Sequence, residues 1–225
     1  MTNTNATRIS QLIKELLANP VDFENRGRGN ELLEFHCNEL LDSIRPLLSH
    51  PNDSVRGTAM FVANELGIGS RPLIDAVIPL MNDVVPRTAY DAMESVFLCA
   101  TDVFADRFVF VVEQLEYTPG VLRQSAMELI SKASVSQLYG AKTRCGEIGN
   151  SAQIHEKCLQ SLIESKVGEI PDVHEMLDSD TELVRLYGVV IAKRIMSKCP
   201  KAIEYAAANT NLDVRQFALE SKGVK

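Results

Sequence analysis

Histidines and cysteines are the side chains of this sequence best suited to nucleophilic catalysis or metal binding. The histidines are scattered along the chain: His36, His50, His155 and His174. His36 and Cys37 cannot form a catalytic dyad on a helix, because adjacent helical residues point about 100° apart. Structural zinc needs four convergent ligands, usually in two close pairs, and Cys145, His155 and Cys158 form only a loose trio. We therefore expect neither a catalytic cysteine nor a metal site.

The cysteines also argue against a disulfide framework. There are five of them, an odd number, and no two form a Cys-x-x-Cys pair: Cys37, Cys99, Cys145, Cys158 and Cys199. We expect most of these cysteines to be small, buried hydrophobic side chains of a protein in a reducing compartment.

Sequence motifs for common enzyme classes are missing. The chain has no Gly-x-Ser-x-Gly elbow, no Gly-x-x-x-x-Gly-Lys loop and no His-Glu-x-x-His pair. The run Gly67-Ile68-Gly69-Ser70 begins like a dinucleotide-binding fingerprint but lacks the third glycine and a preceding strand, so we interpret it as a helix end. Carboxylate pairs such as Asp178 and Asp180 are expected by chance among 30 acidic residues. We expect no enzymatic activity and no cofactor.

Charge points instead to binding. The chain has 30 acidic and 23 basic residues, a net charge of −7, which argues against a protein that grips a nucleic acid backbone. Residues 31–116 hold 14 acidic and five basic residues, a net charge of −9, and each flank carries +1. Two explanations are open for this segment: solubility alone, or a surface that steers and holds a cationic protein.

The elements that would position these charges recur along the chain. An apolar residue followed by arginine, with a small or aromatic residue about three positions later, marks each copy, and the arginines are Arg56, Arg87, Arg123, Arg185 and Arg215. Their intervals of 31, 36, 62 and 30 place an unmarked copy near Ile154. Before Arg56, the run Pro51-Asn52-Asp53-Ser54 supplies turn and N-cap residues. Each arginine therefore marks the start of a predicted helix, preceded by a tight turn and a shorter amphipathic helix.

Stacked helix pairs of this kind bury their apolar faces against one another. We therefore predict an all-α fold, a right-handed α-solenoid forming a single domain over residues 1–225. Residues 1–38 would form N-terminal capping helices at 8–17 and 30–37, joined by a loop over 19–29. Residues 39–225 would form five to six helical pairs. The pair near 134–165 would be irregular, because the stretch 134–151 falls in the unit that lacks the arginine.

The run from Leu47 to Gly67, with its weaker echoes through Arg215, resembles HEAT or HEAT-like repeats over roughly residues 30–225. The spacing near 31 is shorter than the roughly 40 to 47 of long HEAT and armadillo repeats, so the short HEAT-like class fits better. In that family the arginines and aspartates at the turn are scaffold residues that link neighbouring repeats. The resemblance gives this role to Arg56, Arg123, Arg185, Arg215, Asp53, Asp180 and Asp213.

A narrower resemblance suggests a function. The runs Gly29-Asn30-Glu31-Leu32-Leu33-Glu34, Arg45-Pro46-Leu47-Leu48 and Glu65-Leu66-Gly67 are similar to small bacterial HEAT-repeat proteins encoded beside polymorphic toxins, several of which are immunity proteins. The second repeat departs from the usual register by one residue at Pro86-Arg87. The resemblance implies a non-catalytic protein that binds and blocks a basic toxin, such as a nuclease.

A HEAT-like fold is also compatible with three other functions: a general scaffold or adaptor, an enzyme subunit of the phycobilin-lyase-type repeat family, and a HEAT-like DNA glycosylase. The absence of tryptophan, and of lysine between Lys14 and Lys132, disfavours the glycosylase.

The predicted partner-binding residues follow from the repeat register. In solenoids of this type the second helix of each pair lines the concave surface. Phe61 and Asn64 point away from the core of the first repeat, and the same offset selects positions in the next two repeats. Phe61 is either a hot-spot anchor or part of the core between repeats. The full set is Phe61, Asn64, Glu65, Asp91, Glu94 and Glu128.

Membrane insertion and secretion are not expected. The longest run without a charged residue, Ala133 to Ala141, has nine residues, against the roughly 18 to 20 of a spanning helix. Lys14 and Glu15 interrupt the early apolar stretch, unlike a secretory signal. We expect a cytoplasmic protein, with a monomer favoured.

Overall fold

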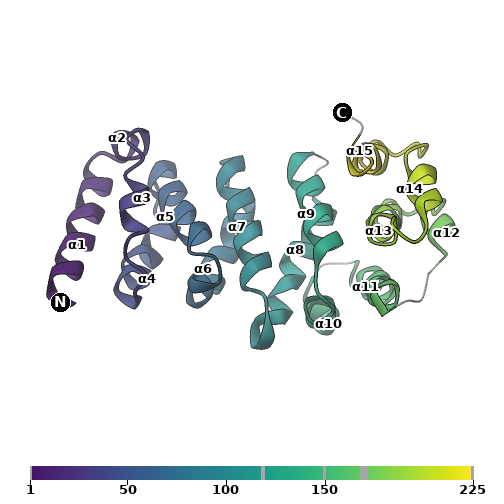
Figure 1. The fold of residues 1–225 in the computed structure, drawn as a ribbon, viewed down its shortest axis with the longest axis horizontal. Coiled ribbons are helices and arrows are strands. Elements are labelled where there is room, and N and C mark those ends of the chain that lie inside the picture. Colours follow the sequence, from purple (N-terminus) through teal and green to yellow (C-terminus); the bar gives the residue numbers. More distant parts are fainter. Residues whose placement is uncertain (1, 118–119, 149–150, 168–171, 224–225) are drawn as a thin grey trace. The chain divides into compact units, whose positions relative to one another are not determined.

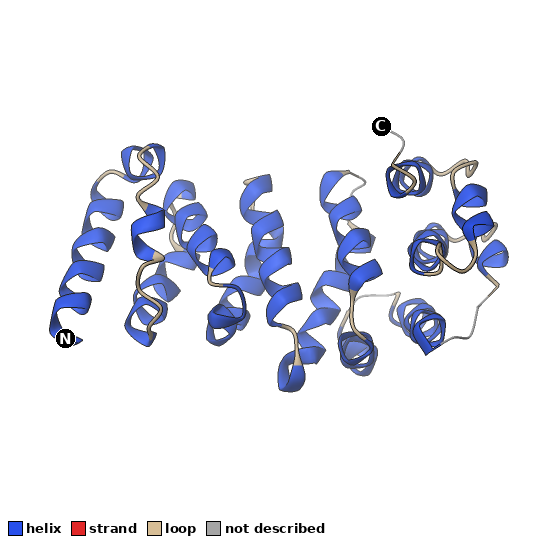
Figure 2. Ribbon diagram, viewed as in Figure 1, coloured by secondary structure: helices blue, strands red, loops and turns tan. Residues whose placement is uncertain are grey.

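The computed structural model describes residues 2–117, 120–148, 151–167 and 172–223, and every regular element within these ranges is helical (Figure 2). The all-α class is therefore confirmed. The chain divides into two units, Met1–Cys99 and Ala100–Lys225, which are described separately. A single domain over 1–225 stays a prediction.

The longest helices of unit 1 are α1, α5 and α7, which follow one another in chain order with shorter segments between them (Figure 1). The core comes from residues such as Leu40, Val55, Met60 and Met93, each at most 1% exposed. Helix α5 packs against α7 on one side and against α3 and η1 on the other. The elements are α1 (Thr2–Ala18), α2 (Pro20–Asn25), α3 (Gly29–Leu32), α4 (Asn38–Ile44), η1 (Arg45–Ser49), α5 (Asp53–Glu65), η2 (Gly67–Leu73), α6 (Ile74–Val77), η3 (Ile78–Asn82) and α7 (Pro86–Cys99).

Prolines convert the first helix of two pairs into mixed α and 3-10 segments. The sequence predicts one amphipathic helix over residues 40–48 and another over 73–81, but α4 passes into η1 at Pro46 and α6 passes into η3 at Pro79. Proline lacks the N–H that an α-helix needs there and its ring crowds the carbonyl four residues earlier. The tighter 3-10 turn takes over at that point.

The predicted loop over 19–29 is wrong, because it contains α2. Asn19 caps this helix by accepting a hydrogen bond from the Asp22 backbone N–H, and Pro20 occupies the first turn. Arg28 fixes the segment through ion pairs with Glu15 and Glu31. The predicted helix over 8–17 lies within α1, whereas the one over 30–37 is shorter, because α3 ends at Leu32.

Unit 2 has a core that includes Phe108, Ile130, Leu159, Tyr187 and Ile191. Helix α13 contacts α9, α11, α12, α14 and α15, so it lies at the centre of this unit. The elements are η4 (Asp102–Phe108), α8 (Val109–Glu113), η5 (Gln114–Glu116), α9 (Val121–Lys132), α10 (Val135–Arg144), η6 (Cys145–Glu147), α11 (Ala152–Val167), α12 (Val173–Leu177), α13 (Glu182–Arg194), α14 (Pro200–Ala206) and α15 (Leu212–Ser221).

The irregular stretch predicted over 134–151 is also wrong where the structure describes it. Helix α10 occupies most of it and begins with a capping box, in which Ser134 and Gln137 each bond the other's backbone N–H. Residues 149–150 lie outside the described part. Helix α11 begins at Ala152, close to the unmarked copy expected near Ile154.

The helices marked by arginine begin one to three residues before it, as predicted, in α5, α7, α9, α13 and α15. Arg56, Arg123 and Arg185 each donate to the carbonyl six residues earlier. Arg56 also reaches the turn before α7, where its Nε lies 2.7 Å from Asp83 Oδ2. Arg56 and Arg123 are thus scaffold residues. Arg215 is exposed and forms no ion pair with the described residues.

No helix in the described ranges is both long enough and apolar enough to cross a bilayer.

Candidate functional site

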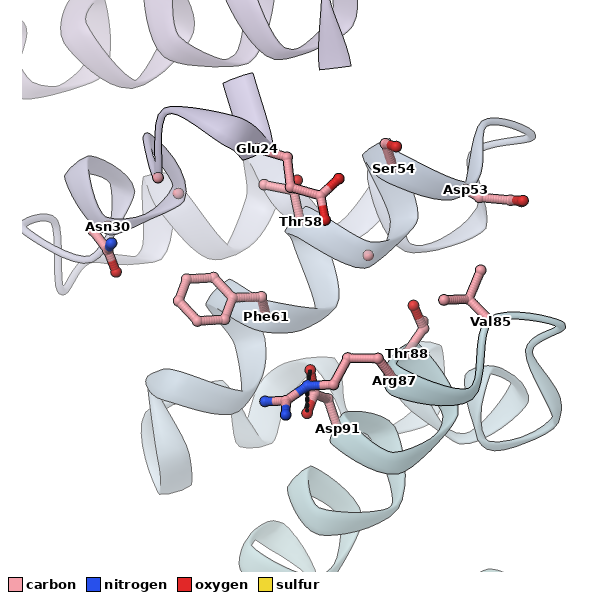
Figure 3. A pocket seen from close by; sticks show the side chains of 13 residues that line it. Glu24, Asn30, Asp53, Ser54, Thr58, Phe61, Val85, Arg87, Thr88 and Asp91 are labelled. Atoms are coloured by element: carbon pink, nitrogen blue, oxygen red, sulfur yellow. Dashed lines mark hydrogen bonds and ion pairs between the residues drawn. The ribbon is translucent and has the colours of Figure 1, made fainter. Parts of the chain in front are cut away.

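A pocket of about 420 Å³ opens within unit 1. Its walls are the α2 to α3 turn, the first half of α5 and the start of α7 (Figure 3). Two predicted partner-binding residues, Phe61 and Asp91, line it. It is the place where the predicted binding surface becomes concave.

Glycines shape this pocket. A Cβ on Gly29 would lie 3.2 Å from Phe61 Cδ1, and one on Gly57 would lie 3.4 Å from Thr88 Oγ1. Small residues at these two positions let α3 and α7 approach α5 closely. Gly27, with φ of +64°, makes the turn that leads the chain from α2 into α3.

Phe61 packs between helices and is also exposed to the pocket. Its side chain packs against Gly29, and the residue is half-buried. It also lines the pocket, so part of its ring faces the open space (Figure 3). Phe61 therefore joins two helices and still offers an aromatic surface to a ligand.

Asp91 and Arg87 form the charged wall. Arg87 Nε donates to Asp91 Oδ2 at 3.0 Å and lies 2.9 Å from Oδ1, although hydrogen-bond geometry is met only at Oδ2. The Asp91 side chain is 4% exposed and that of Arg87 is 71% exposed. Burial raises the pKa of Asp91; Arg87 lowers it and Glu94 and Glu65 raise it, so the net pKa is raised.

A buried hydroxyl also lines the pocket. Thr58 is 6% exposed, and its Oγ1 has no hydrogen-bond partner among the described residues. Buried polar atoms normally find partners, and leaving one unmade costs about 1–3 kcal/mol. Thr58 Oγ1 is therefore an unfilled polar position in the pocket, whereas both Asp91 oxygens lie within 3.0 Å of Arg87 Nε.

The sequence did not assign Arg87 to the site, although one signal was present. Pro86 shifts this arginine one residue later than Arg56 in the repeat pattern. Arg87 makes no ion pair to a neighbouring repeat within the described chain; it pairs with Asp91 on its own helix, and its Cζ lies 5.8 Å from the centre of the Tyr90 ring. The register shift thus frees an arginine from the scaffold.

The other predicted residues divide between the two units. On the next turn of α5 and α7, Asn64 Nδ2 donates to Glu94 Oε2 at 3.1 Å, and Glu65 is exposed. Glu128 lies on α9 in unit 2 and already pairs with Lys132 and Lys193. Burial raises the pKa of Glu128, but the hydrogen bonds from Lys193 and Lys132 outweigh burial, so the net pKa is lowered. The carboxylate is therefore ionised and already paired.

A second polar cluster lies in the core of unit 2. His155 is fully buried, with Nε2 2.8 Å from Glu116 Oε1 and Nδ1 2.7 Å from the Tyr187 hydroxyl. Because the Glu116 carboxylate only accepts, Nε2 carries the proton and Nδ1 accepts from Tyr187. Both ring nitrogens are thus occupied, and no group of three His, Cys, Asp or Glu side chains in the described chain could hold a metal ion.

The nearby thiols are unreactive. Burial raises the pKa of Cys145 to about 11 and that of Cys158 to about 12. A nucleophilic cysteine needs a thiolate, and at neutral pH both groups are thiols. The geometry of this cluster is that of a satisfied core network.

This network predicts a pH dependence of stability. Burial lowers the pKa of His155, Glu116 raises it, and the net pKa lies below the ordinary value. The unfolded chain therefore binds a proton at higher pH than the folded chain, so the free energy of unfolding falls as pH drops below about 6.5. Urea denaturation between roughly pH 5 and 7.5 should show a shallower fall for His155→Gln than for the parent. Equal slopes would assign the acid sensitivity to other groups.

Comparison with known proteins adds little to this description. No family model and no curated protein matches the sequence. Among solved structures, the chain is similar to the crystal structure of an engineered protein, with 13% identity, 96% of each chain covered and a TM-score of 0.45. A likeness at this level carries no argument, so the function is argued from the geometry of the site.

Proposed function

We propose that the protein acts by stoichiometric binding of a cationic protein, with no reaction of its own, through the acidic α5 and α7 surface of unit 1. In its most specific form, it is a cytoplasmic immunity protein that covers the substrate site of a basic toxin such as a nuclease. The argument rests on which carboxylates remain free in this unit.

The observation that carries the proposal is the internal use of basic residues in unit 1. Residues 1–99 contain 13 acidic and eight basic residues, a net charge of −5. Arg8, Arg26, Arg28, Arg56 and Arg87 are all taken up by ion pairs inside the unit. The excess negative charge is therefore left on the surface.

Several carboxylates of unit 1 form no ion pair with any described residue: Glu24, Glu34, Asp42, Glu65 and Glu94. Glu24 lines the pocket, and Glu65 and Glu94 lie close enough to Asp91 to raise its pKa. Such a field raises the association rate of a cationic partner and disfavours anionic ones. The negative field of Glu65 and Glu94 thus reaches the pocket at Asp91.

A HEAT-like solenoid would suit this role, because stacked helix pairs present successive helices on one face. Two contacts of unit 1 support that arrangement. Helices α5 and α7 pack side by side, and Arg56 at the start of α5 pairs with Asp83 in the turn before α7. The glutamates of both helices then share one surface.

Affinity capture from the native host at low salt, followed by kinetics with the captured partner, tests the proposal. The partner is expected to be basic, and its association rate should fall as salt rises from low to physiological levels. The double variant Glu24→Lys and Glu65→Lys should slow association about tenfold at low salt. The matched control Glu175→Lys and Glu204→Lys makes the same charge change at exposed positions of unit 2 and should have a much smaller effect.

An acidic partner, or an association rate that does not respond to salt, would overturn the proposal. Equal slowing by both double variants would show that net charge matters and that the α5 and α7 surface does not. A partner that binds this surface and takes part in assembly, without being inhibited, would support the adaptor role in place of immunity.

A further inference from the structure

We infer that the unit 1 pocket is a receptor for one basic side chain, arginine or lysine, presented by the partner protein. The inference rests on the proposed function and names the group of the partner that unit 1 would recognise. Its support is the set of acceptors, charges and rings that line the pocket.

The polar atoms that line the pocket are suited to a donor. Asp91 Oδ1 is buried and lies 2.9 Å from Arg87 Nε without hydrogen-bond geometry, and a carboxylate has room for several donors. The Thr58 residue is 6% exposed, and its Oγ1 has no hydrogen-bond partner in the described chain. Glu24, at the rim, has a free carboxylate. A guanidinium or ammonium group supplies N–H donors and no acceptor, which is the complement of this wall.

The charge of the pocket has the sign that such a group requires. Three lining residues are acidic, Glu24, Asp53 and Asp91, and one, Arg87, is basic. Asp53 is already paired with Arg56 at 2.8 Å. Asp91 is paired with Arg87, and the negative charges of Glu94 and Glu65 act against that pairing by raising the pKa of Asp91. A cation that enters the pocket therefore meets a negative site, because Arg87 neutralises only part of the pocket's charge.

Phe61 adds an aromatic ring to the acceptors and charges that line the pocket. Its ring lines the same pocket as Arg87 and Asp91 (Figure 3). Aromatic faces attract cations, by about 0.5–1 kcal/mol at exposed sites. A basic side chain lying along Phe61 would bury its methylene stem against the ring and place its charged end beside Asp91.

Arg87 shows that a guanidinium fits this wall, and it also acts as a competitor. Its guanidinium bonds Asp91 from the same helix, yet the side chain is mostly exposed, so little packing holds it in place. Removing Arg87 should strengthen a cation site and weaken an anion site. The sign of that change separates the two.

The experiment titrates the full-length protein with acetyl-arginine amide and acetyl-lysine amide, followed by NMR. Saturable shifts are expected at the amides of Gly29, Gly57 and Thr58, and acetyl-glutamine amide should cause none. Phe61→Leu should weaken the arginine probe about threefold. Glu24→Gln should also weaken it, whereas Glu34→Gln, the same change at an exposed free carboxylate outside the pocket, should leave it unchanged.

The decisive variant is Arg87→Met, which should bind the arginine probe about threefold more tightly because Asp91 is no longer paired. Weaker binding in this variant, or shifts caused by acetyl-glutamate amide in the parent, would overturn the inference and identify an anion site. Shifts spread over all exposed carboxylates would also overturn it. Since the probes need no partner, a basic partner that binds to α5 and α7 with an unresponsive pocket refutes this inference alone.

Discussion

Replacing Arg123 with methionine is expected to lower the free energy of unfolding by about 3 kcal/mol. The Arg123 side chain is 5% exposed, and its guanidinium donates to Asp213 Oδ2 at 2.9 Å and to Glu182 Oε1 at 3.1 Å. Methionine preserves most of the volume but leaves the Asp213 carboxylate, 8% exposed, without its cation. Urea denaturation followed by circular dichroism measures the loss.

Two further variants identify the cause. Arg215 has the same place in its repeat but is exposed and unpaired in the described chain, so Arg215→Met should change stability by less than about 0.5 kcal/mol. Combining Arg123→Met with Asp213→Leu should recover part of the loss, because apolar residues can replace a buried ion pair. A double variant no more stable than Arg123→Met would show that lost packing, rather than the unpaired carboxylate, causes the effect.

The arginines illustrate how far the sequence predicts this fold. Helix starts are local: turn residues and caps such as Asn52, which accepts from the Ser54 and Val55 N–H groups, lie next to the helix they begin. Some of their partners are distant in sequence, since Arg56 reaches 27 residues ahead to Asp83 and Arg123 reaches 90 residues ahead to Asp213. One repeated signature therefore predicts where helices begin but does not distinguish a linking arginine from an exposed one.

The missed helix α2 has a similar origin. Pro20, Gly27 and Gly29 lie close together, and such residues are typical of a loop. Pro20 is instead in the first turn of α2, where its missing donor costs nothing. Ion pairs from Arg28 to α1 and α3 then hold the short helix in place, and a local pattern contains no sign of them.

For the candidate site, the register predicts the face but not the pocket. Counting from the arginine of each repeat selects Phe61 and Asp91, which do lie on one wall. Thr58 and Glu24 were not selected. The first lies one turn before Phe61, and the second lies in the stretch predicted to be a loop. A concave site depends on how three segments meet, which the periodicity of one helix does not specify.

Gly140 also shows that a local pattern does not reveal a tertiary contact. It lies in the stretch predicted to be irregular. Glycine has a low helix propensity, yet Gly140 is an interior residue of α10. Its role is spatial: α10 packs against η4, and the backbone of Ala105 and Asp106 runs directly over Gly140. A residue that weakens the helix locally is the one that permits the tertiary contact.

Gly140→Ala is therefore expected to destabilise the protein, although alanine is the better helix former. A Cβ at this position would lie 2.4 Å from the Ala105 carbonyl carbon and 2.6 Å from the Asp106 nitrogen, and backbone atoms cannot turn aside. The gain in helix propensity is about 1 kcal/mol, while overpacking of this severity costs about 3 kcal/mol or more. The net loss of about 2 kcal/mol or more should appear in urea denaturation, with faster hydrogen exchange in α10.

Gly146 is the matched control for this change. It lies in η6 of the same unit, its φ is not positive, and a Cβ there would meet no atom within 4 Å. Gly146→Ala should thus be neutral or stabilise by about 0.5 kcal/mol, because alanine restricts the unfolded chain. If the two variants proved equally stable, α10 and η4 could not approach as closely as they do here. If only Gly140→Ala is unstable, the close approach, rather than the loss of glycine flexibility, requires glycine at residue 140.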